Sequence, residues 1–299
     1  MVSTTCTDAA GNSASASHAV NLDKTAPMVS GSRTPAANVY GWNNTNVTAH
    51  FTATDGLSGV QGSATANVLV STEGTGQTAS YSFTDKAGNS SSATVSNINI
   101  DKTAPVLTMP SLAGSYGLNS SLTLTFAATD ALSQIATQSA TLNGNPVSSG
   151  STVVLTQLGT NTFVLTATDK AGNSVTETRQ FTVSYTFGGF LSPLAGNRTT
   201  FHLGSVIPVK FDLYDANGTP ISTAVALLSL QQLSNGEPVG DPIDATPTSG
   251  ADSGNLFRYS GGHYMYNLST KSFTAGIWRI QATLDDGTVR TIEIGLTAK

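Results

Sequence analysis

The chain has 299 residues, of which 10% are charged, and its formal net charge is −5 at pH 7. This balance excludes a nucleic-acid partner, because the phosphate backbone needs a basic face. The single cysteine, Cys6, excludes an intrachain disulfide, and no apolar run approaches the ~20 residues of a membrane helix, so we expect no membrane insertion.

A short turn motif is written three times along the chain. Its copies span residues 7–12, 84–89 and 168–173, and each begins with Thr-Asp and ends with Ala-Gly-Asn. The pentapeptide Asp-Lys-Thr-Ala-Pro follows the first two copies, at 23–27 and 101–105. A repeat of about 80 residues is too long for a solenoid turn and suits one small β-sandwich. The spacing therefore predicts a string of separate sandwiches.

Residues 1–22 hold the first copy of the motif and no further part of a sandwich. The segment from Val2 to Leu22 predicts one hairpin, the C-terminal hairpin of a truncated repeat. The start of the chain carries no charged-then-apolar signal sequence. We therefore expect a secretion signal on a missing N-terminal part of a longer protein.

Residues 23–100 predict the first complete sandwich. The clearest strand, at 47–54, carries apolar side chains along one face: Val47, Ala49, Phe51 and Ala53. Further strands are expected at 66–71, 78–84 and 91–100, with Tyr81 and Phe83 facing inward. The motif at 84–89 turns the chain between the last two strands, and Gly88 supplies the positive φ that this turn needs.

Residues 101–185 predict a second sandwich on the same plan. One strand is expected across 122–128, with Leu122, Leu124, Phe126 and Ala128 facing inward. Another, at 162–168, has Phe163, Leu165 and Ala167 inward. No segment shows a helical period. The pattern predicts an all-β fold of tandem immunoglobulin-like β-sandwiches in a beads-on-a-string array.

The linkers, the loop Thr-Asp-Gly-Leu-Ser-Gly-Val at 54–60 and the Asp-Lys-Ala-Gly-Asn turns resemble tandem bacterial immunoglobulin-like repeats of surface proteins. The resemblance covers residues 1 to about 185. It implies an extracellular or cell-surface location and the role of a spacer or adhesin stalk, with neighbouring repeats or an unknown surface ligand as partners.

Residues 186–299 form a different unit after the break at 185–190. The run Pro208-Val209-Lys210-Phe211 is similar to the PxKF domain, which often ends secreted bacterial proteins, and the segments 276–279 and 284–287 fit that family too. The resemblance implies no defined activity. We expect the junction before this C-terminal sandwich to be held by packing of Phe187 and Phe190, or to act as a hinge at Gly188 and Gly189.

The residues offer no catalytic site. Catalysis needs a nucleophile, a base and an orienting group within hydrogen-bond reach, and zinc needs three or four clustered His or Cys ligands. The four histidines are scattered over three units: His18, His50, His202 and His263. We therefore expect no enzyme, no catalytic residue and no zinc site.

Register brings acidic residues together at one pole of each complete sandwich. The linker, the loop after the second strand and the turn of the repeated motif meet there, and each contributes one aspartate. The first pole would gather Asp23, Asp55 and Asp85, and the second Asp101, Asp130 and Asp169. Crowded carboxylates suit calcium, which takes six to eight oxygen ligands, so these six residues predict calcium at the domain junctions. The alternative is that each aspartate only forms a turn by bonding nearby backbone N–H groups.

Two other functions stay open beside the stalk. The C-terminal sandwich can be a module that binds a glycan or a protein, or the chain can be an accessory region of a secreted hydrolase whose catalytic domain lies upstream. A glycan platform would use the aromatic residues near the end of the chain: Phe257, Tyr259, Tyr264, Tyr266, Phe273 and Trp278. Their alternation favours core positions instead, with polar tips bonded at the rim.

Overall fold

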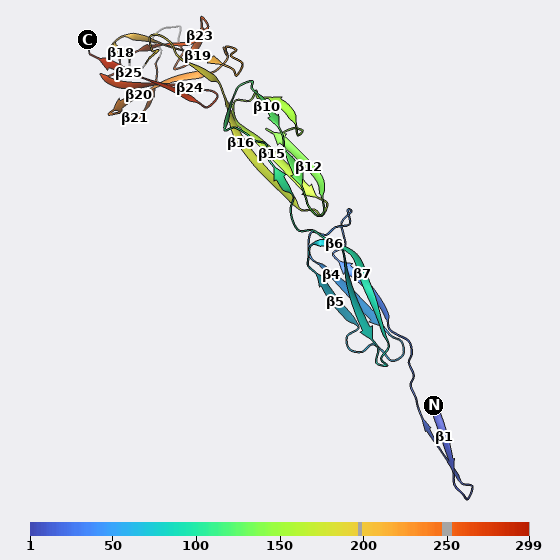
Figure 1. Ribbon diagram of the computed structural model, residues 1–299. Coiled ribbons are helices and arrows are strands. Elements are labelled where there is room, and N and C mark those ends of the chain that lie inside the picture. The colour runs from blue at the N-terminus through green and yellow to red at the C-terminus, as the bar shows by residue number, and fades with distance from the viewer. Residues whose placement is uncertain (197–198, 247–252, 299) are drawn as a thin grey trace. The chain divides into compact units, whose positions relative to one another are not determined.

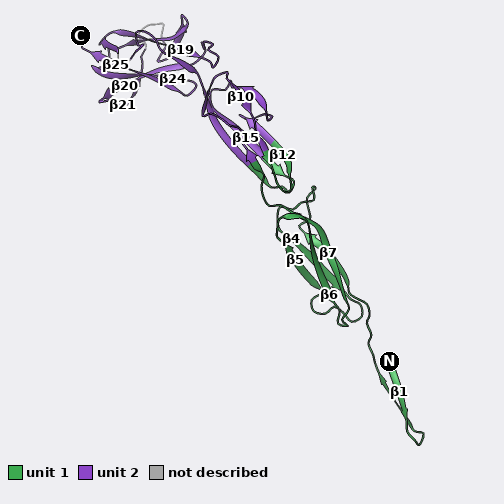
Figure 2. Ribbon diagram, in the orientation of Figure 1, with its two compact units in different colours: residues 1–106, 128–138, 167–175 green, residues 107–127, 139–166, 176–299 purple. Residues whose placement is uncertain are grey.

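The computed structural model describes residues 1–196, 199–246 and 253–298 (Figure 1). Every regular element in these ranges is a β-strand, so the predicted all-β class is confirmed. No helix in the described ranges has the length and apolar character needed to cross a membrane. The chain separates into two compact units (Figure 2). One contains residues 1–106, 128–138 and 167–175, and the other residues 107–127, 139–166 and 176–299.

The first unit begins with an isolated hairpin of β1 (Val2–Thr7) and β2 (Ser13–His18), whose residues are all exposed. Its turn is fixed by Asp8, whose Oδ1 accepts hydrogen bonds from the N–H groups of Ala10 and Asn12, both at 2.9 Å. The Asn12 side chain donates to the other carboxylate oxygen at 3.0 Å. The repeated motif thus folds locally, because its hydrogen bonds lie within the turn.

The first sandwich packs two antiparallel sheets over one core. One sheet has the order β3-β4-β5 and the other pairs β6 with β7. The bounds are β3 Met28–Thr34, β4 Val47–Thr54, β5 Thr65–Val70, β6 Gly74–Thr84 and β7 Ser90–Ile100. The predicted inward face of β4 is buried, as is Phe83. Tyr81 is 41% exposed instead, because its ring lies at the rim of the core beside Phe51 and Phe83, where an amphipathic aromatic fits.

The strands of the second sandwich include a five-stranded sheet of order β13-β12-β15-β16-β9 and the pair β10-β14. Their bounds are β9 Ser115–Gly117, β10 Ser121–Leu124, β12 Ile135–Leu142, β13 Asn145–Pro146, β14 Ser151–Val154, β15 Gly159–Asp169 and β16 Ser174–Ser184. Two short strands, β8 (Val106–Thr108) and β11 (Ala127–Thr129), complete the set. Phe163, Leu165 and Ala167 are buried, as alternation predicts.

The single strand expected across 122–128 is broken in two, after Leu124. Phe126 is buried, but both its backbone groups bond the Ser149 hydroxyl: its N–H donates at 2.9 Å, and its C=O accepts at 2.5 Å. A side chain therefore takes the place of a neighbouring strand at this residue. Beyond the break Ala128 is half-buried, whereas the sequence predicts it inside.

The C-terminal sandwich, within the second unit, has two sheets. The first has the order β17-β19-β23-β22, with bounds Thr186–Phe190, Val206–Tyr214, His263–Ser269 and Arg258–Ser260. The second has the order β18-β25-β24-β20-β21, with bounds Thr199–His202, Val289–Thr297, Gly276–Leu284, Ala226–Ser234 and Glu237–Asp244. Their inner faces share a core rich in leucine, isoleucine and aromatic residues, including Phe211, Tyr264 and Tyr266.

The junction inside the second unit is not held by Phe187 and Phe190. Both rings pack against Phe211 within the C-terminal sandwich. The junction is held instead by Tyr185, whose side chain is buried in that core and whose N–H donates to Asp286 Oδ2 at 2.8 Å. A second contact joins Asn119 Nδ2 to Asp215 Oδ2 at 3.1 Å.

The expected hinge at Gly188 and Gly189 is wrong as well, because both glycines belong to strand β17. A Cβ on Gly188 would lie 2.8 Å from the Tyr214 ring, so this glycine makes room for a neighbouring side chain. Gly189 has φ +95° and lies where the register of β17 against β19 shifts. Each glycine therefore has a packing or bulge role rather than that of a flexible linker.

Candidate metal centres at two sandwich poles

Two groups of three aspartates lie close together, as their matching positions in the two sandwiches predict. Asp23, Asp55 and Asp85 form one trio, in which each residue has a carboxylate oxygen within 4.8 Å of the others. Asp101, Asp130 and Asp169 form a second trio by the same measure. Each trio takes one residue from the linker, one from the loop after a strand and one from the repeated turn, and both lie within the first compact unit. Their role as metal ligands stays a prediction.

The linker aspartate bridges the linker and the loop in the same way at both poles. Asp23 Oδ1 accepts from the N–H of Thr25 at 2.9 Å, and its Oδ2 accepts from the N–H of Ser58 at 3.0 Å. At the second pole Asp101 accepts from Thr103 and from Ser133, both at 3.0 Å. Each carboxylate thus fixes the direction in which the chain enters its sandwich.

The loop aspartate uses one oxygen and leaves the other open. Asp55 Oδ1 accepts from the N–H of Gly59 at 2.7 Å and of Leu57 at 3.2 Å. Asp130 Oδ1 accepts from Gln134 at 2.7 Å and from Leu132 at 3.1 Å. No hydrogen bond from the described residues ends on Oδ2 of either side chain. Each pole therefore offers one carboxylate oxygen with no protein donor in these ranges.

The turn aspartate is held by the asparagine four residues later. Asn89 donates to Asp85 from its backbone N–H at 2.8 Å and from Nδ2 at 2.7 Å, and Asn173 donates to Asp169 at the same two distances. Nδ2 of Asn89 also donates to the carbonyl of Asp23, at 3.2 Å. The two asparagines thus act as donors that hold the carboxylates.

In the part of the chain that the structure describes, no basic side chain balances the charge of either trio. None of the six aspartates makes an ion pair with any residue that the structure describes. The Ser58 side chain and the Thr25 N–H lower the pKa of Asp23. Burial acts to raise the pKa of Asp85, but the bonds from Asn89 outweigh it, and the pKa is lowered. Both carboxylates are therefore ionised at neutral pH, and like charges this close repel one another.

The arrangement fits calcium and also fits turn formation. Calcium takes carboxylate, carbonyl and water oxygens at 2.3–2.6 Å, and each pole offers three carboxylates with one unbonded oxygen. The N–H bonds to the other oxygens are those of Asx turns, which form without a metal. An Asx turn does not explain why three such carboxylates meet at one place. The crowding is the feature that favours a cation.

Aspartates at the strand ends of the C-terminal sandwich have a different environment. Asp215 accepts from the N–H groups of Asn217 and Thr219, at 2.8 and 2.9 Å, and from the Asn119 side chain. The bond from Asn119 is the main cause that lowers the pKa of Asp215. Asp286 accepts from Thr288 and Tyr185. Among the described residues neither belongs to a group of three metal-binding side chains.

The aromatic residues of the C-terminal sandwich do not form an exposed glycan platform. Phe257, Tyr264, Tyr266 and Trp278 are buried, and Tyr259 is 38% exposed. The tyrosine hydroxyls bond backbone groups: Tyr264 accepts from the N–H of Ala224, and Tyr266 donates to the carbonyl of Gly254. Burial raises the pKa of both phenols. The four buried residues are core, and the two tyrosines among them have their polar tips at the rim, as alternation predicts.

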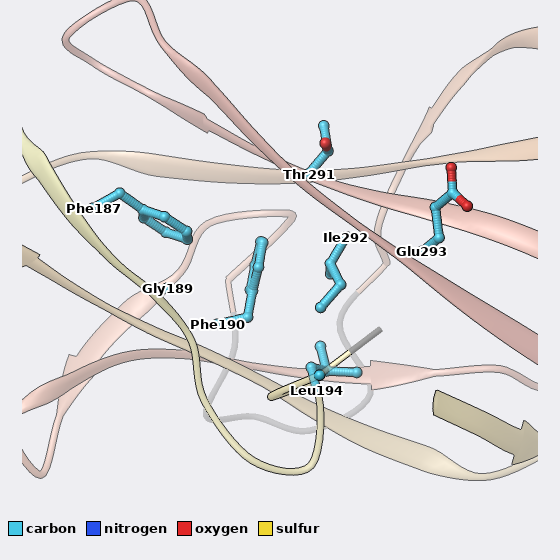
Figure 3. Close-up of a pocket in the computed structure, with 8 residues that line it drawn as sticks. Phe187, Gly189, Phe190, Leu194, Thr291, Ile292 and Glu293 are labelled. Atoms are coloured by element: carbon cyan, nitrogen blue, oxygen red, sulfur yellow. The ribbon is translucent and has the colours of Figure 1, made fainter. Parts of the chain in front are cut away.

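Two features were not found from the sequence. His263 Nδ1 lies 2.5 Å from Asp212 Oδ1, on neighbouring strands of one sheet. No described nucleophile is bonded to that histidine, so the pair alone supports no catalysis. The second feature is a cleft of about 740 Å³ in the C-terminal sandwich (Figure 3). Both depend on which residues lie opposite each other across strands, which periodicity within one strand does not give.

No family model matches the chain, and no curated protein matches it. Among solved structures, a three-immunoglobulin-domain fragment of titin matches at 12% identity over 92% of this chain and 99% of that chain, with a TM-score of 0.33. The first five immunoglobulin domains of Sidekick-1 match at 11% identity over 92% of this chain and 60% of that chain, with a TM-score of 0.32. Four extracellular cadherin domains of protocadherin gamma B2 match at 13% identity over 99% and 82%, with a TM-score of 0.29.

These scores are too low to carry a functional argument. The sheets and cores described above make the chain an array of immunoglobulin-like β-sandwiches. The similarity of residues 186–299 to the PxKF domain finds no support in the comparisons and stays a prediction.

Proposed function

We propose that this chain is a non-catalytic extracellular stalk or adhesin segment of a bacterial surface or secreted protein, with junctions that calcium stiffens. A stalk needs successive sandwiches whose linkers do not swing freely. The extracellular location rests on the resemblance of the linkers and turns to surface-protein repeats and on a hydroxyl-rich composition with few charges.

The observation that carries the proposal is the bonding of linker 101–103 at both of its ends. On one side Glu73 accepts from the Lys102 N–H at 2.6 Å, and the Lys102 ammonium donates to the Ser71 carbonyl at 2.6 Å. On the other side Asp101 accepts from Ser133. A direct contact, from Asn38 Nδ2 to the Lys170 carbonyl at 2.7 Å, adds to these within the same unit. A linker bonded in this way behaves as a short rigid spacer.

Calcium would complete this linkage at the second pole. Asp101, Asp130 and Asp169 would hold the ion, together with loop carbonyls and water. The ion would neutralise the mutual repulsion of the three carboxylates and connect the linker to two loops. A ligand that binds only the folded state stabilises it by RT ln(1 + [L]/Kd), which is about 2.7 kcal/mol at a hundredfold excess over Kd.

The test compares the whole chain in calcium, in magnesium and in a chelator. We expect two calcium ions per chain after dialysis. In calcium the region around Trp42, whose unfolding is followed by tryptophan fluorescence, should have a higher melting temperature. A larger maximum dimension in small-angle scattering is expected as well. Magnesium should not substitute, because it demands tight octahedral geometry. If the chelator changes neither the melting curve nor the scattering, the calcium part is wrong, and the trios are turn formers alone.

A second function, a binding module in residues 186–299, is favoured by one observation. The cleft of the C-terminal sandwich falls in the size range of small-molecule sites, which is ~300–1,000 Å³. Its lining differs from the buried aromatic residues that the sequence put forward for a glycan.

A further inference from the structure

Strand β5 is an edge of the first sandwich. It is the last strand of the sheet β3-β4-β5, and in the described chain it pairs with β4 alone (Figure 1). The pairing is regular from Thr65 to Val70, without a register shift. Backbone groups on the other side of such a strand have no partner within the sheet, so they can bond a further strand.

The register of β5 shows which residues have free backbone groups. The N–H of Ala53 donates to the carbonyl of Ala64 at 2.9 Å, so these two residues form a hydrogen-bonded pair of the ladder. Bonded and non-bonded pairs alternate along an antiparallel ladder. Every second residue from Ala64 onwards therefore bonds β4, whereas Thr65, Asn67 and Leu69 direct both backbone groups away from it.

Two of these three residues are open. The Ser63 hydroxyl donates to the carbonyl of Thr65 at 2.9 Å and accepts from its N–H at 3.2 Å, which caps the start of the strand. In the described ranges no strand or loop bonds Asn67 or Leu69 on the side away from β4. Two N–H groups and two carbonyls are therefore available to a partner.

Other edge strands of the chain carry features that hinder pairing with a second chain. β21 contains two prolines and three acidic residues. β9 and β13 have only three and two residues, and β6 pairs with β7 through two register shifts. Prolines, charges, short length and bulges are the ways in which natural proteins protect their edges. β5 has the sequence Thr-Ala-Asn-Val-Leu-Val and shows none of these features.

The surroundings of β5 suit a second copy of the same strand. A symmetric contact brings like side chains together, so charged residues at the edge would oppose it. His50, which bonds the Asn67 side chain, is the only residue of β4 and β5 with an acidic or basic side chain. Leu69 is 60% exposed and adds an apolar side chain beside the free edge. Charge therefore does not keep two such edges apart.

We propose that β5 pairs with β5 of a second copy of this chain, antiparallel and about a two-fold axis. The arrangement that uses all the free groups places Asn67 of one copy opposite Leu69 of the other, twice across the axis. The two sheets would become one continuous sheet, and the two first sandwiches would point in opposite directions. The Leu69 side chains would lie diagonally across the axis, within reach of each other. The inference goes beyond the stalk and uses none of the six aspartates.

The test is sedimentation equilibrium of the full chain up to ~0.5 mM, because contacts that bury less than ~1,200 Å² are weak. A chelator and a reductant are kept in every sample, so that neither calcium nor a disulfide between exposed Cys6 thiols can join two chains. The chain is expected to form a reversible dimer. Because calcium is absent, a failure here leaves the stalk proposal untouched.

Asn67→Pro tests the free backbone edge. The N–H of Asn67 points away from β4, so proline removes a donor of the proposed contact and no bond of the β4 ladder. Association should weaken at least tenfold, since the lost bond occurs twice in the dimer. Asn67→Ala is the matched control, because it also removes the side-chain bond to His50 but keeps the N–H. It should associate as the unchanged chain does, and melting curves show whether each variant is folded.

Charge at Leu69 identifies the partner strand, whether or not the proline variant folds. Leu69→Lys and Leu69→Glu should each weaken association about fivefold, because like charges would meet across the axis. An equimolar mixture of the two variants should associate more strongly than either variant alone. Met28→Lys is the control, since Met28 is 77% exposed on β3, at the opposite edge of the same sheet. It should associate as the unchanged chain does.

Three results would overturn the proposal. One is a chain that stays monomeric at ~0.5 mM. Another is association of Asn67→Pro or of Leu69→Lys, where each is folded, that equals that of the unchanged chain. The third is a mixture of the lysine and glutamate variants that associates no more strongly than either alone. That result would mean that β5 meets a different surface of the second copy, such as the exposed hairpin of β1 and β2.

Discussion

The chain joins its sandwiches in two ways, because the junction at Asp101 is built from other contacts than the junction at Tyr185. Both place an aspartate at the end of a strand in an Asx turn. At the Asp101 junction three carboxylates meet without a basic side chain from the described residues. At the Tyr185 junction Asp215 meets the Asn119 amide, and Tyr185 is buried in the C-terminal core. The same turn can thus support a charged junction that invites a cation, or an apolar and hydrogen-bonded junction that does not.

The largest expected effect is a loss of stability from a substitution at Tyr185, which should act on that junction and not on the one at Asp101. Tyr185→Ala removes a side chain that is 5% exposed, and truncation of a buried aromatic costs about 3–5 kcal/mol. The chain has two tryptophans, Trp42 in the first sandwich and Trp278 in the C-terminal one. In urea, Trp278 fluorescence should show the full loss of stability, measured in the Trp42→Phe background.

Trp42 fluorescence, measured in the Trp278→Phe background, should not shift. The matched control is Thr103→Ala in the other linker. Among the described residues the Thr103 hydroxyl bonds only the exposed Glu73, so the loss of stability should be small at both tryptophans. An equal loss at Trp42 and Trp278 would show that the two junctions unfold together, and the distinction between them would fail.

The next substitution should change stability in opposite directions with and without calcium. Asp130→Asn keeps Oδ1, which takes the turn bonds, and changes only the oxygen without a described donor. In chelator the variant should be more stable, because one of three crowded charges is gone. In calcium it should be less stable, because a ligand is lost. Differential scanning calorimetry should show shifts of about 4 °C in each direction, the scale of ~1 kcal/mol for a domain of this size.

Asp215→Asn is the control at the Tyr185 junction. Its Oδ2 accepts from Asn119 Nδ2, so an amide nitrogen in that place would face a second donor. The variant should lose stability by the same amount with and without calcium. A calcium-dependent shift at Asp215, or no reversal at Asp130, would contradict the assignment of the cation to the three-carboxylate pole.

Acid should weaken the junction at Asp215 through the lowered pKa of this carboxyl. A group whose folded pKa lies below its unfolded value, ~3.9, gives stability that is complete above the unfolded pKa. That stability is lost as the pH falls through the folded pKa. The urea concentration at the midpoint of unfolding, followed by Trp278 fluorescence, should therefore decrease as the pH is lowered below about 4. Asn119→Ala should reduce this acid-sensitive part, because its side chain is the main cause of the shift. An unchanged pH profile in that variant would refute this cause.

Alternation within single strands accounts for what the sequence could predict of the fold. It placed Phe51, Phe163 and Leu165 in cores, and the repeated spacing brought the six aspartates together in two groups of three. These features depend on one strand or on repetition of one plan. The sequence could not predict whether the aspartates hold an ion, because an Asx turn and a calcium ligand use the same residue.

The features that could not be predicted from the sequence depend on contacts with distant segments of the chain. The break after Leu124 depends on the Ser149 hydroxyl, and the junction at Tyr185 depends on Asp286. The inward position of Arg290 could have been noticed, because it breaks the alternation of Ile292 and Ile294. Its contact with the Phe187 ring depends on the packing of two sheets, which the alternation within one strand does not show.

The smallest expected effect tests whether the linker at the charged junction is held from both sides. Glu73 is exposed, so Glu73→Ala should change global stability by less than about 1 kcal/mol. It removes the acceptor of the Lys102 N–H, and amide hydrogen exchange there should speed up about tenfold, the effect of losing one hydrogen bond of ~1.4 kcal/mol. The neighbouring Asp101 N–H bonds the Asn43 carbonyl and should keep its rate. Faster exchange at both amides would mean that Glu73 supports the whole linker. No change at either would mean that the carboxylate pole alone fixes it.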